Sequence, residues 1–353
     1  MVYRHALRII IRAEKARGYF IYYIWKPKVK GMEKFRKIQE DRQVKLMGTG
    51  VFEGDPGDGV FMGKKRVYVL QKGLHNLYEP IRAEALKYFR DNNISWWGGF
   101  RPTNHTLSSQ IACLNHLIAI KNDKEAVLAL LNGVRDEFED VLPIPCDAEP
   151  AYIAFEVVSD NDHLNEKVAT RGTQCTSVDA FIYAVHRGDH KKWLIPIEWK
   201  YVEQYGKGDK STEDRPGEPK GSNGRGRTRL ARYSGLIDAS EQLETLSDYK
   251  GSVYYQEPFY QLMRQTLLAE NIVKNSSIES LKAEDYLHIH VIPKGNAELL
   301  NRRFAVSGKT MEATWRSMLK DQTKYVIVDP SDLMKPIAAM YPELLKYLQA
   351  RYL

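Results

Sequence analysis

The chain has 353 residues, of which 43% are hydrophobic and 27% are charged, as in an ordinary soluble globular protein with one large domain or two smaller ones. The net charge of +7 favours an anionic partner such as nucleic acid. Three cysteines without a CxxC pair argue against a zinc ribbon and against a secreted disulfide framework.

The N-terminal segment is basic and aromatic. Residues 3–17 predict a basic helix, either an amphipathic docking helix or a contact with nucleic acid. Charged residues interrupt its apolar positions, so no secretory signal is visible, and the apolar run at 19–25 is too short to span a bilayer. We therefore expect a cytoplasmic protein without a membrane partner.

The remaining elements follow in an order typical of an α/β domain. Residues 1–104 predict a mainly helical N-terminal extension, with the basic helix, a short hairpin within 51–70 and a helix at 76–92. Residues 105–353 predict a second domain. Its expected helices are at 106–120, 123–138, 258–274, 310–320 and 342–352, and its expected strands at 151–159, 177–185, 193–203, 285–293 and 324–329. This order predicts a mixed central β-sheet flanked by helices.

Residues 206–232 differ abruptly from their neighbours. They contain six Gly, two Pro and eight Lys or Arg against four Asp or Glu. Such a composition predicts a mobile loop, which is either a solvated linker or an arm that becomes ordered on a phosphate backbone. The candidate nucleic-acid-binding residues are Lys220, Arg225, Arg227, Arg229 and Arg232, together with Arg171 ahead of the strand at 177–185.

Two charged residues lie on one face of an otherwise apolar strand. In "LIPIEWKYVE", Glu198 and Lys200 alternate with aromatic and aliphatic residues. A hairpin turned at Gly188–Asp189, of the type II′ kind or as a symmetric four-residue loop, places Asp179 directly opposite Glu198, about 5 Å away at Cβ. Like charges opposed in a sheet are destabilising, so this pairing needs a reason.

A divalent cation supplies that reason. Mg²⁺ is typically held by one or two carboxylates together with substrate oxygens, which fits Asp179 and Glu198. Lys200 would orient or activate the attacking water, and Glu166, between the first two strands of the second domain, would be a third acid. The alternative is a Lys200 salt bridge to either acid on a solvated sheet face.

The segment "SVDAFIYAV…LIPIEWK" resembles the PD-(D/E)XK nuclease superfamily, which has the restriction-endonuclease-like fold. Asp179 and Glu198-Trp199-Lys200 match its signature, with Val178 where Pro is often found. The helix "LSSQIACLNHL" is similar to one in a bacterial restriction-endonuclease-like branch. The segment "YQLMRQTLLAE" is similar to a later helix of RecB-type nucleases, and this makes Gln261 and Arg264 supporting residues. The resemblance covers roughly residues 105–330.

The resemblance implies a Mg²⁺-dependent deoxyribonuclease, with Mn²⁺ as a possible substitute. We expect an endonuclease of restriction or defence type that acts on DNA, more readily double-stranded, and that forms a homodimer if it cuts both strands. The alternatives are a nuclease for RNA, a nucleic-acid-binding protein of the same fold without turnover, and a metal-dependent enzyme for a small phosphorylated substrate. A GxSxG elbow is absent from the sequence, and "FAVSGKT" lacks the first Gly of a P-loop.

Overall fold

The computed structural model describes residues 34–353 except 98, 146–147, 168–170, 172–174 and 207. The helix predicted at 3–17 lies outside the described residues. Residues 34–353 form one compact unit, and no second unit begins at the boundary predicted between 104 and 105 in this part of the chain.

The described residues form helices and strands close to those predicted. The α-helices are α1 (Phe35–Leu46), α2 (Arg82–Asp91), α3 (Ser109–Leu117), α4 (Lys124–Val134), α5 (Gly224–Asp238), α6 (Phe259–Lys274), α7 (Ala297–Leu300), α8 (Met311–Arg316), α9 (Pro330–Met334) and α10 (Pro342–Tyr352). The strands are β1 (Val60–Phe61), β2 (Lys64–Lys65), β3 (Phe138–Leu142), β4 (Ile153–Val157), β5 (Val178–His186), β6 (Lys192–Trp199), β7 (Asp285–Tyr286), β8 (His288–Val291) and β9 (Tyr325–Val328). None of the described helices is long and apolar enough to cross a membrane.

The central sheet is mixed, as predicted, and has seven strands. Its order is β3-β5-β6-β8-β9, with β4 paired to β5 and β7 paired to β6. The pairs β3–β5, β4–β5 and β5–β6 are antiparallel, whereas β6–β7, β6–β8 and β8–β9 are parallel. Parallel pairing requires a crossover, and α5 and α6 lie in the connection between β6 and β8.

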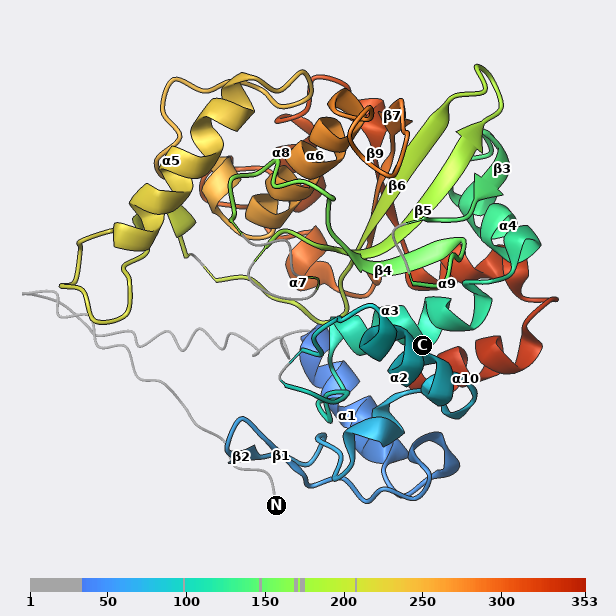
Figure 1. Cartoon of the computed structure of the whole chain (residues 1–353). Coiled ribbons are helices and arrows are strands. Elements are labelled where there is room, and N and C mark those ends of the chain that lie inside the picture. Colours follow the sequence, from blue (N-terminus) through green and yellow to red (C-terminus); the bar gives the residue numbers. More distant parts are fainter. Residues whose placement is uncertain (1–33, 98, 146–147, 168–170, 172–174, 207) are drawn as a thin grey trace, which may run out of the picture. The chain divides into compact units, whose positions relative to one another are not determined.

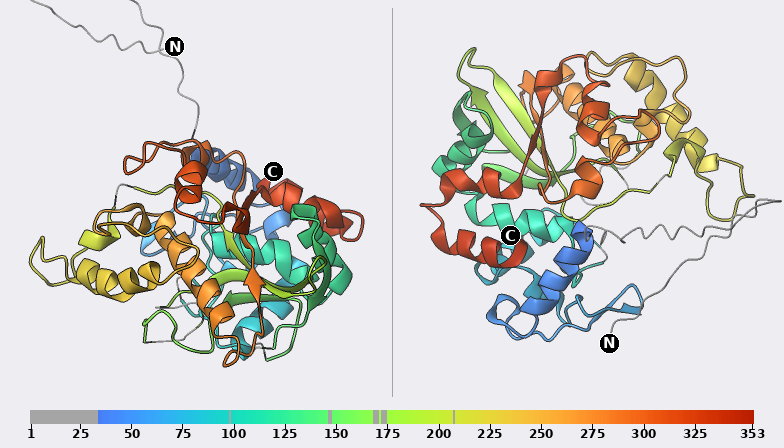
Figure 2. Two further views of the ribbon diagram at one scale, coloured as in Figure 1. Left: turned by 90° about the horizontal axis from the view of Figure 1, so that it is seen from above. Right: turned by 180° about the vertical axis from the view of Figure 1, so that it is seen from behind.

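Helices cover both faces of this sheet (Figure 1; Figure 2 gives two further views). On one face, Ile195 and Ile197 pack in a core with residues of α2, α3, α4, α9 and α10. On the other, Phe181 and Leu194 pack in a second core with residues of α5, α6 and α8. Because both faces are buried, the strands are nearly continuous apolar runs, and a charge within them is conspicuous.

The predicted pairing of β5 with β6 is the observed one. Ala180 pairs with Ile197 and Val185 with Lys192, so the next position along places Asp179 opposite Glu198. The type II′ turn is not formed, because the left-handed residue of the connection is His190 (φ 56°). A symmetric four-residue loop closed by the His186 N–H and the Lys191 carbonyl (2.9 Å) keeps the register.

We predicted a mobile loop at 206–232. The prediction is wrong for the end of this segment, because residues 224–232 form the N-terminal part of α5. Leu230, Tyr233 and Ile237 give this helix an apolar side, of which Tyr233 and Ile237 are fully buried. The glycines serve close packing here. A Cβ on Gly226 would lie 1.9 Å from the carbonyl oxygen of Ser211, the middle residue of the 3₁₀ turn Lys210–Thr212.

We expect Gly226→Ala to lower the free energy of unfolding by about 1–3 kcal/mol, because the backbone of Ser211 must move to admit the methyl group. Gly235→Ala is the matched control in the same helix, since nothing lies within 4 Å of its Cβ position. Alanine should stabilise the helix there by about 0.5–1 kcal/mol. Urea unfolding of the two variants measures both effects, and equal midpoints would contradict the close packing of α5.

Candidate active site

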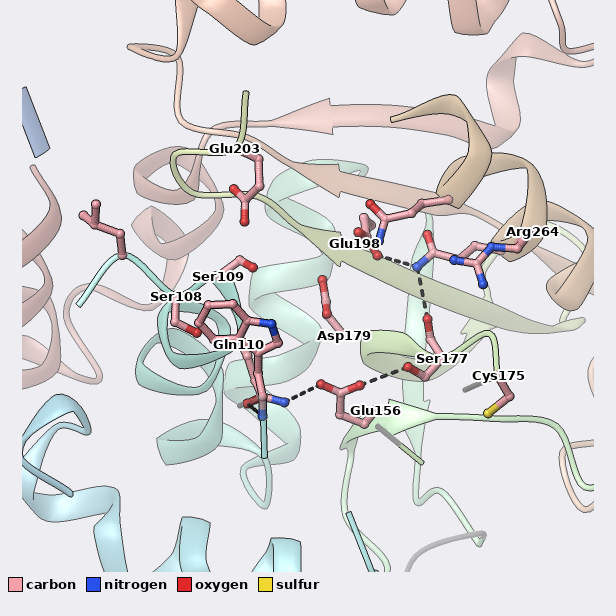
Figure 3. Close-up of a pocket in the computed structure, with 14 residues that line it drawn as sticks. Ser108, Ser109, Gln110, Glu156, Cys175, Ser177, Asp179, Glu198, Glu203 and Arg264 are labelled. Carbon is pink, nitrogen blue, oxygen red and sulfur yellow. Dashed lines mark hydrogen bonds between the residues drawn. The ribbon is translucent and has the colours of Figure 1, made fainter. Parts of the chain in front are cut away.

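Three carboxylates lie next to one another across β4, β5 and β6. The register of β5 and β6 places Asp179 opposite Glu198, one position beyond the pair Ala180–Ile197. On its other side, Phe155 pairs with Ala180 and Val157 with Val178, so Glu156 is the residue of β4 opposite Asp179. Figure 3 shows the carboxylate of Asp179 between those of Glu156 and Glu198. The row of three acids belongs to one end of the antiparallel part of the sheet.

These acids line a cavity of about 370 Å³. Glu203 is a fourth acid in its wall, and Arg264 is the only cation among the described residues that line it. The start of α3 contributes Ser108, Ser109 and Gln110, and one side of α6 contributes Gln261, Arg264 and Gln265. The cavity is therefore strongly polar and has an excess of negative charge.

Glu198 and Lys200 form a buried ion pair (3% and 5% side-chain exposure). Gln265 also donates to Glu198, and the Lys200 ammonium donates to Gln261 Oε1 at 2.7 Å. Burial acts to raise the pKa of Glu198, but Lys200 outweighs it and the pKa lies below its ordinary value. Burial acts to lower the pKa of Lys200, but the charge of Glu198 outweighs it and the pKa lies well above its ordinary value. Both groups are therefore charged at neutral pH.

Asp179 has the opposite electrostatic environment. Its Oδ2 accepts the backbone N–H of Trp199 at 2.7 Å, and no described residue donates to its Oδ1. Burial and the charges of Glu198 and Glu156 raise the pKa of Asp179 well above its usual range. This carboxylate is thus the one that gains most from a nearby cation.

Glu156 is held by specific contacts in a strained backbone. Its φ of 51° lies in the left-handed region, which costs a non-glycine residue about 1–2 kcal/mol. Its carboxylate accepts Gln110 Nε2 at 2.7 Å and Ser177 Oγ at 3.0 Å. Burial raises the pKa of Glu156, against the effect of these two hydrogen bonds. Such strain, maintained by polar contacts beside a cavity, is typical of functional sites.

Glu166, the third acid predicted from the sequence, does not line this cavity in the described structure. Its carboxylate accepts the N–H (2.5 Å) and hydroxyl (2.7 Å) of Thr176 and the hydroxyl of Tyr233 (2.5 Å). Arg264 lies 3.8 Å away and connects Glu166 to the cavity wall. The structure therefore brings Glu156, and not Glu166, beside Asp179 and Glu198.

The candidate nucleic-acid-binding residues are distributed over two regions. Arg171 donates to the backbone carbonyl oxygen of Glu156 at 3.2 Å and to the Tyr88 hydroxyl at 3.0 Å, so its contacts stabilise β4 and its connection to α2. Lys220 is exposed in the turn before α5, which carries the other four arginines. Arg225 and Arg227 are exposed, and Arg225 lies 3.4 Å from the Glu213 carboxylate. Arg229 is paired with the same Glu213, and Arg232 lies 5.7 Å from the centre of the Tyr233 ring.

The donor set fits a hard divalent cation. No group of three or more His, Cys, Asp or Glu side chains in the described ranges is already arranged to hold a metal ion. One or two carboxylates with free positions for substrate oxygens are nevertheless the usual protein contribution to a Mg²⁺ site. The carboxylates of Asp179 and Glu198 would hold such an ion, with Glu156 next to them.

Comparison with known proteins identifies the family. The family described as restriction endonuclease associating with ARP matches residues 47–353. The chain belongs to this family. Neither the curated proteins nor the solved structures include a match.

Membership of this restriction endonuclease family makes the chain a nuclease of the restriction-endonuclease kind, and all the residues of the cavity lie inside the matched region. The match begins at residue 47, so the family includes the hairpin β1–β2 and α2, which the resemblance seen in the sequence did not cover.

Sequence reasoning overlooked Glu156 and Gln265. Glu156 is the only acid in the predicted strand 151–159, a signal comparable to that of Glu198. The connection between β4 and β5 is long, so the register of the two strands could not be predicted, and nothing in the sequence placed Glu156 opposite Asp179. Gln265 follows Gln261 by one helical turn, and this spacing indicates that both side chains lie on one side of α6.

Proposed function

We propose that this protein is a metal-dependent nuclease of the PD-(D/E)XK type that hydrolyses phosphodiester bonds of DNA. The observation that carries the proposal is the row of carboxylates Glu156, Asp179 and Glu198, with Lys200, directly after the end of β6, paired with Glu198. When bound there, Mg²⁺ or Mn²⁺ supplies Lewis-acid stabilisation of the charge that develops on the phosphodiester.

The residues around the acids have separable roles in this proposal. Lys200 remains an ammonium, so it stabilises negative charge and orients water instead of removing a proton. Gln261 fixes the Lys200 ammonium, and Gln265 fixes the Glu198 carboxylate. The start of α3 lies in the same cavity and offers the positive end of its helix dipole to a phosphate.

Two arginines, one from α5 and one from α6, and a tyrosine of α6 connect the basic residues of α5 with this cavity. Arg229 and Arg264 lie over the ring of Tyr260, at 5.5 and 4.7 Å from its centre, so a cationic stack runs from α5 into the cavity wall. The exposed Arg225 and Arg227 extend the positive charge outward. We assign these arginines and Lys220 to the sugar–phosphate backbone, whose binding should weaken with salt. Cleavage of both strands would use a homodimer.

The proposal is tested by incubating the purified full chain with DNA and, separately, RNA in the presence of Mg²⁺, Mn²⁺ or EDTA. We expect metal-dependent cleavage of DNA and none in EDTA. Absence of cleavage of both polymers with either metal would overturn the assignment, and cleavage of RNA alone would change the substrate.

Two matched variants decide which third acid acts in the site. We expect Glu156→Gln to slow cleavage by about a hundredfold or more, because it removes a charge beside the proposed cation. Glu166→Gln should retain cleavage within about tenfold, because Glu166 makes its contacts with Thr176 and Tyr233. Rates of single-turnover cleavage measure both effects, and the reverse order of the two variants would return the third-acid role to Glu166.

A further inference from the structure

Trp96 and Trp97 are adjacent in the sequence but have different environments. Trp96 is 7% exposed, and its ring stacks on that of Phe89 at 3.7 Å between centroids. Trp97 is 45% exposed and lines the cavity that contains Asp179 and Glu198. Trp96 thus belongs to the core, whereas Trp97 presents a large aromatic surface to solvent next to the acids.

Trp97 is part of an aromatic cluster at the edge of the cavity. The ring of Phe61, from β1, stacks on Trp97 at 5.0 Å with an interplanar angle of 29°. His105 contacts both rings edge-on, at 5.1 Å from Phe61 and 5.9 Å from Trp97. Burial lowers the pKa of His105 to about 4, so this ring is neutral at neutral pH and supports the stack as an uncharged aromatic group.

The surroundings of this cluster combine exposed apolar and cationic side chains. Phe100 and Met62 are 102% and 71% exposed, so the two chain segments that carry Trp97 and Phe61 present further large apolar side chains to solvent. Lys64 and Arg101 are exposed in the same two segments. Aromatic surfaces interleaved with cations are typical of sites that bind unpaired nucleic acid, where bases stack and phosphates pair with the cations.

A hydrogen-bonded connection joins the cluster to the row of acids. The backbone N–H of Trp97 donates to Gln110 Oε1 at 3.0 Å, and Gln110 Nε2 donates to Glu156 Oε1 at 2.7 Å. One amide side chain therefore fixes both the aromatic surface and an acid of the proposed active site. A base lying on Trp97 would have its neighbouring phosphate close to the carboxylates.

We propose that Trp97, supported by Phe61, is a stacking platform for an unpaired nucleobase adjacent to the phosphodiester that is cut. The inference rests on the proposed nuclease function and specifies its substrate: nucleic acid that is single-stranded or locally unpaired at the cleavage point. Lys64 and Arg101 bind flanking phosphates. Trp97 is then a specificity-determining residue, because a fully stacked duplex offers no free base face to the platform.

Binding measured without cleavage tests the platform separately from the chemistry. The full chain in EDTA is titrated with a single-stranded oligonucleotide, and with the same strand in a perfect duplex, while fluorescence anisotropy is recorded. We expect Trp97→Ala to weaken binding of the single strand by about tenfold or more, the loss typical of one stacking contact. Its affinity for the duplex should stay within about twofold.

The comparison variants separate stacking from general damage. Trp97→Phe should retain most of the affinity for the single strand, and Met340→Ala should retain all of it, because Met340 is similarly exposed (43%) but lies outside the cavity wall. A 2-aminopurine placed in the single strand provides a readout in the unmodified protein, since stacking on Trp97 should quench its fluorescence. This readout remains informative if Trp97→Ala does not fold.

The outcomes are distinct from those of the nuclease proposal. If the protein cuts DNA but Trp97→Ala binds single strand and duplex as the parent does, the platform is overturned and the nuclease function stands. If Trp97→Ala weakens both equally, or changes only self-association of the protein, the platform is likewise overturned. If single strands bind through Trp97 while no metal supports cleavage, the platform stands and the proposed catalysis fails.

Discussion

Asp179→Asn should lower the cleavage rate by about a thousandfold or more and should stabilise the metal-free protein. The first effect follows from removing a charge that would hold the proposed cation, an interaction worth several kcal/mol. The second follows from the neighbours of Asp179, because Glu156 and Glu198 on the adjacent strands oppose its ionisation. Asparagine retains the shape and the hydrogen bond from the Trp199 N–H without the charge.

The pH dependence has a definite sign. The folded protein raises the pKa of Asp179, so between the unfolded value of about 3.9 and the raised folded value the native state binds more protons than the unfolded state. Stability of the parent in EDTA therefore falls as pH rises through this window. The contribution of Asp179 to that fall is absent from Asp179→Asn, and the advantage of the variant should grow with pH until the raised pKa is passed.

Thermal unfolding between pH 5 and pH 8, with EDTA or with Mg²⁺, checks this expectation. Mg²⁺ should raise the Tm of the parent and leave that of Asp179→Asn nearly unchanged, because a ligand stabilises only the state that binds it. Glu343→Gln is the control, since it removes a carboxylate that is 77% exposed and remote from the acids. A parent and an Asp179→Asn variant with equal Tm in EDTA at every pH would contradict the described electrostatics.

The strands that carry the site were predictable because their sequence signals are local. The strands predicted at 177–185 and 193–203 have nearly the bounds of β5 and β6. A symmetric loop between them gives the same register whichever of its residues has the left-handed conformation. Asp179 and Glu198 were thus assigned to one face from residue spacing alone. The alternation along β6 also predicts that Ile195 and Ile197 face away from Leu194, and this is confirmed, since the two isoleucines pack in one core and Leu194 packs in the other.

The parts that could not be predicted depend on contacts between distant segments. The glycines of α5 resemble those of a linker until Ser211 is seen to pack against Gly226. Glu156 lies in a predicted strand and Glu166 in the connection that follows it, and only the pairing of β4 with β5 shows which of them lies beside Asp179. Strand β3 was not predicted, and its first residue, Phe138, was placed at the end of the predicted helix 123–138, because β3 is determined by pairing with the second half of β5.

Of the substitutions proposed here, Lys200→Met should cause the largest loss of folding stability, together with a large loss of cleavage activity. Removing the ammonium leaves Glu198 buried without its ion-pair partner, which typically costs about 3–5 kcal/mol of folding free energy. Cleavage should fall by about a hundred- to a thousandfold, the usual effect of removing one group that stabilises developing negative charge. Urea unfolding and single-turnover cleavage measure the two effects on the same preparation.

The double variant Glu198→Gln/Lys200→Met separates stability from catalysis. Gln at position 198 removes the unpaired charge while Gln265 remains beside it, so most of the lost stability should return although cleavage does not.

The pH profile of the parent discriminates between two roles for Lys200. The pKa of Lys200 lies well above its ordinary value, so its contribution to stability is constant at neutral pH and is lost only as pH rises through that raised pKa. Cleavage should therefore show no lysine titration between pH 6 and 9. A rate that rises with a single pKa in that range, and loses this dependence in Lys200→Met, would make Lys200 a general base and contradict its role as a fixed positive charge.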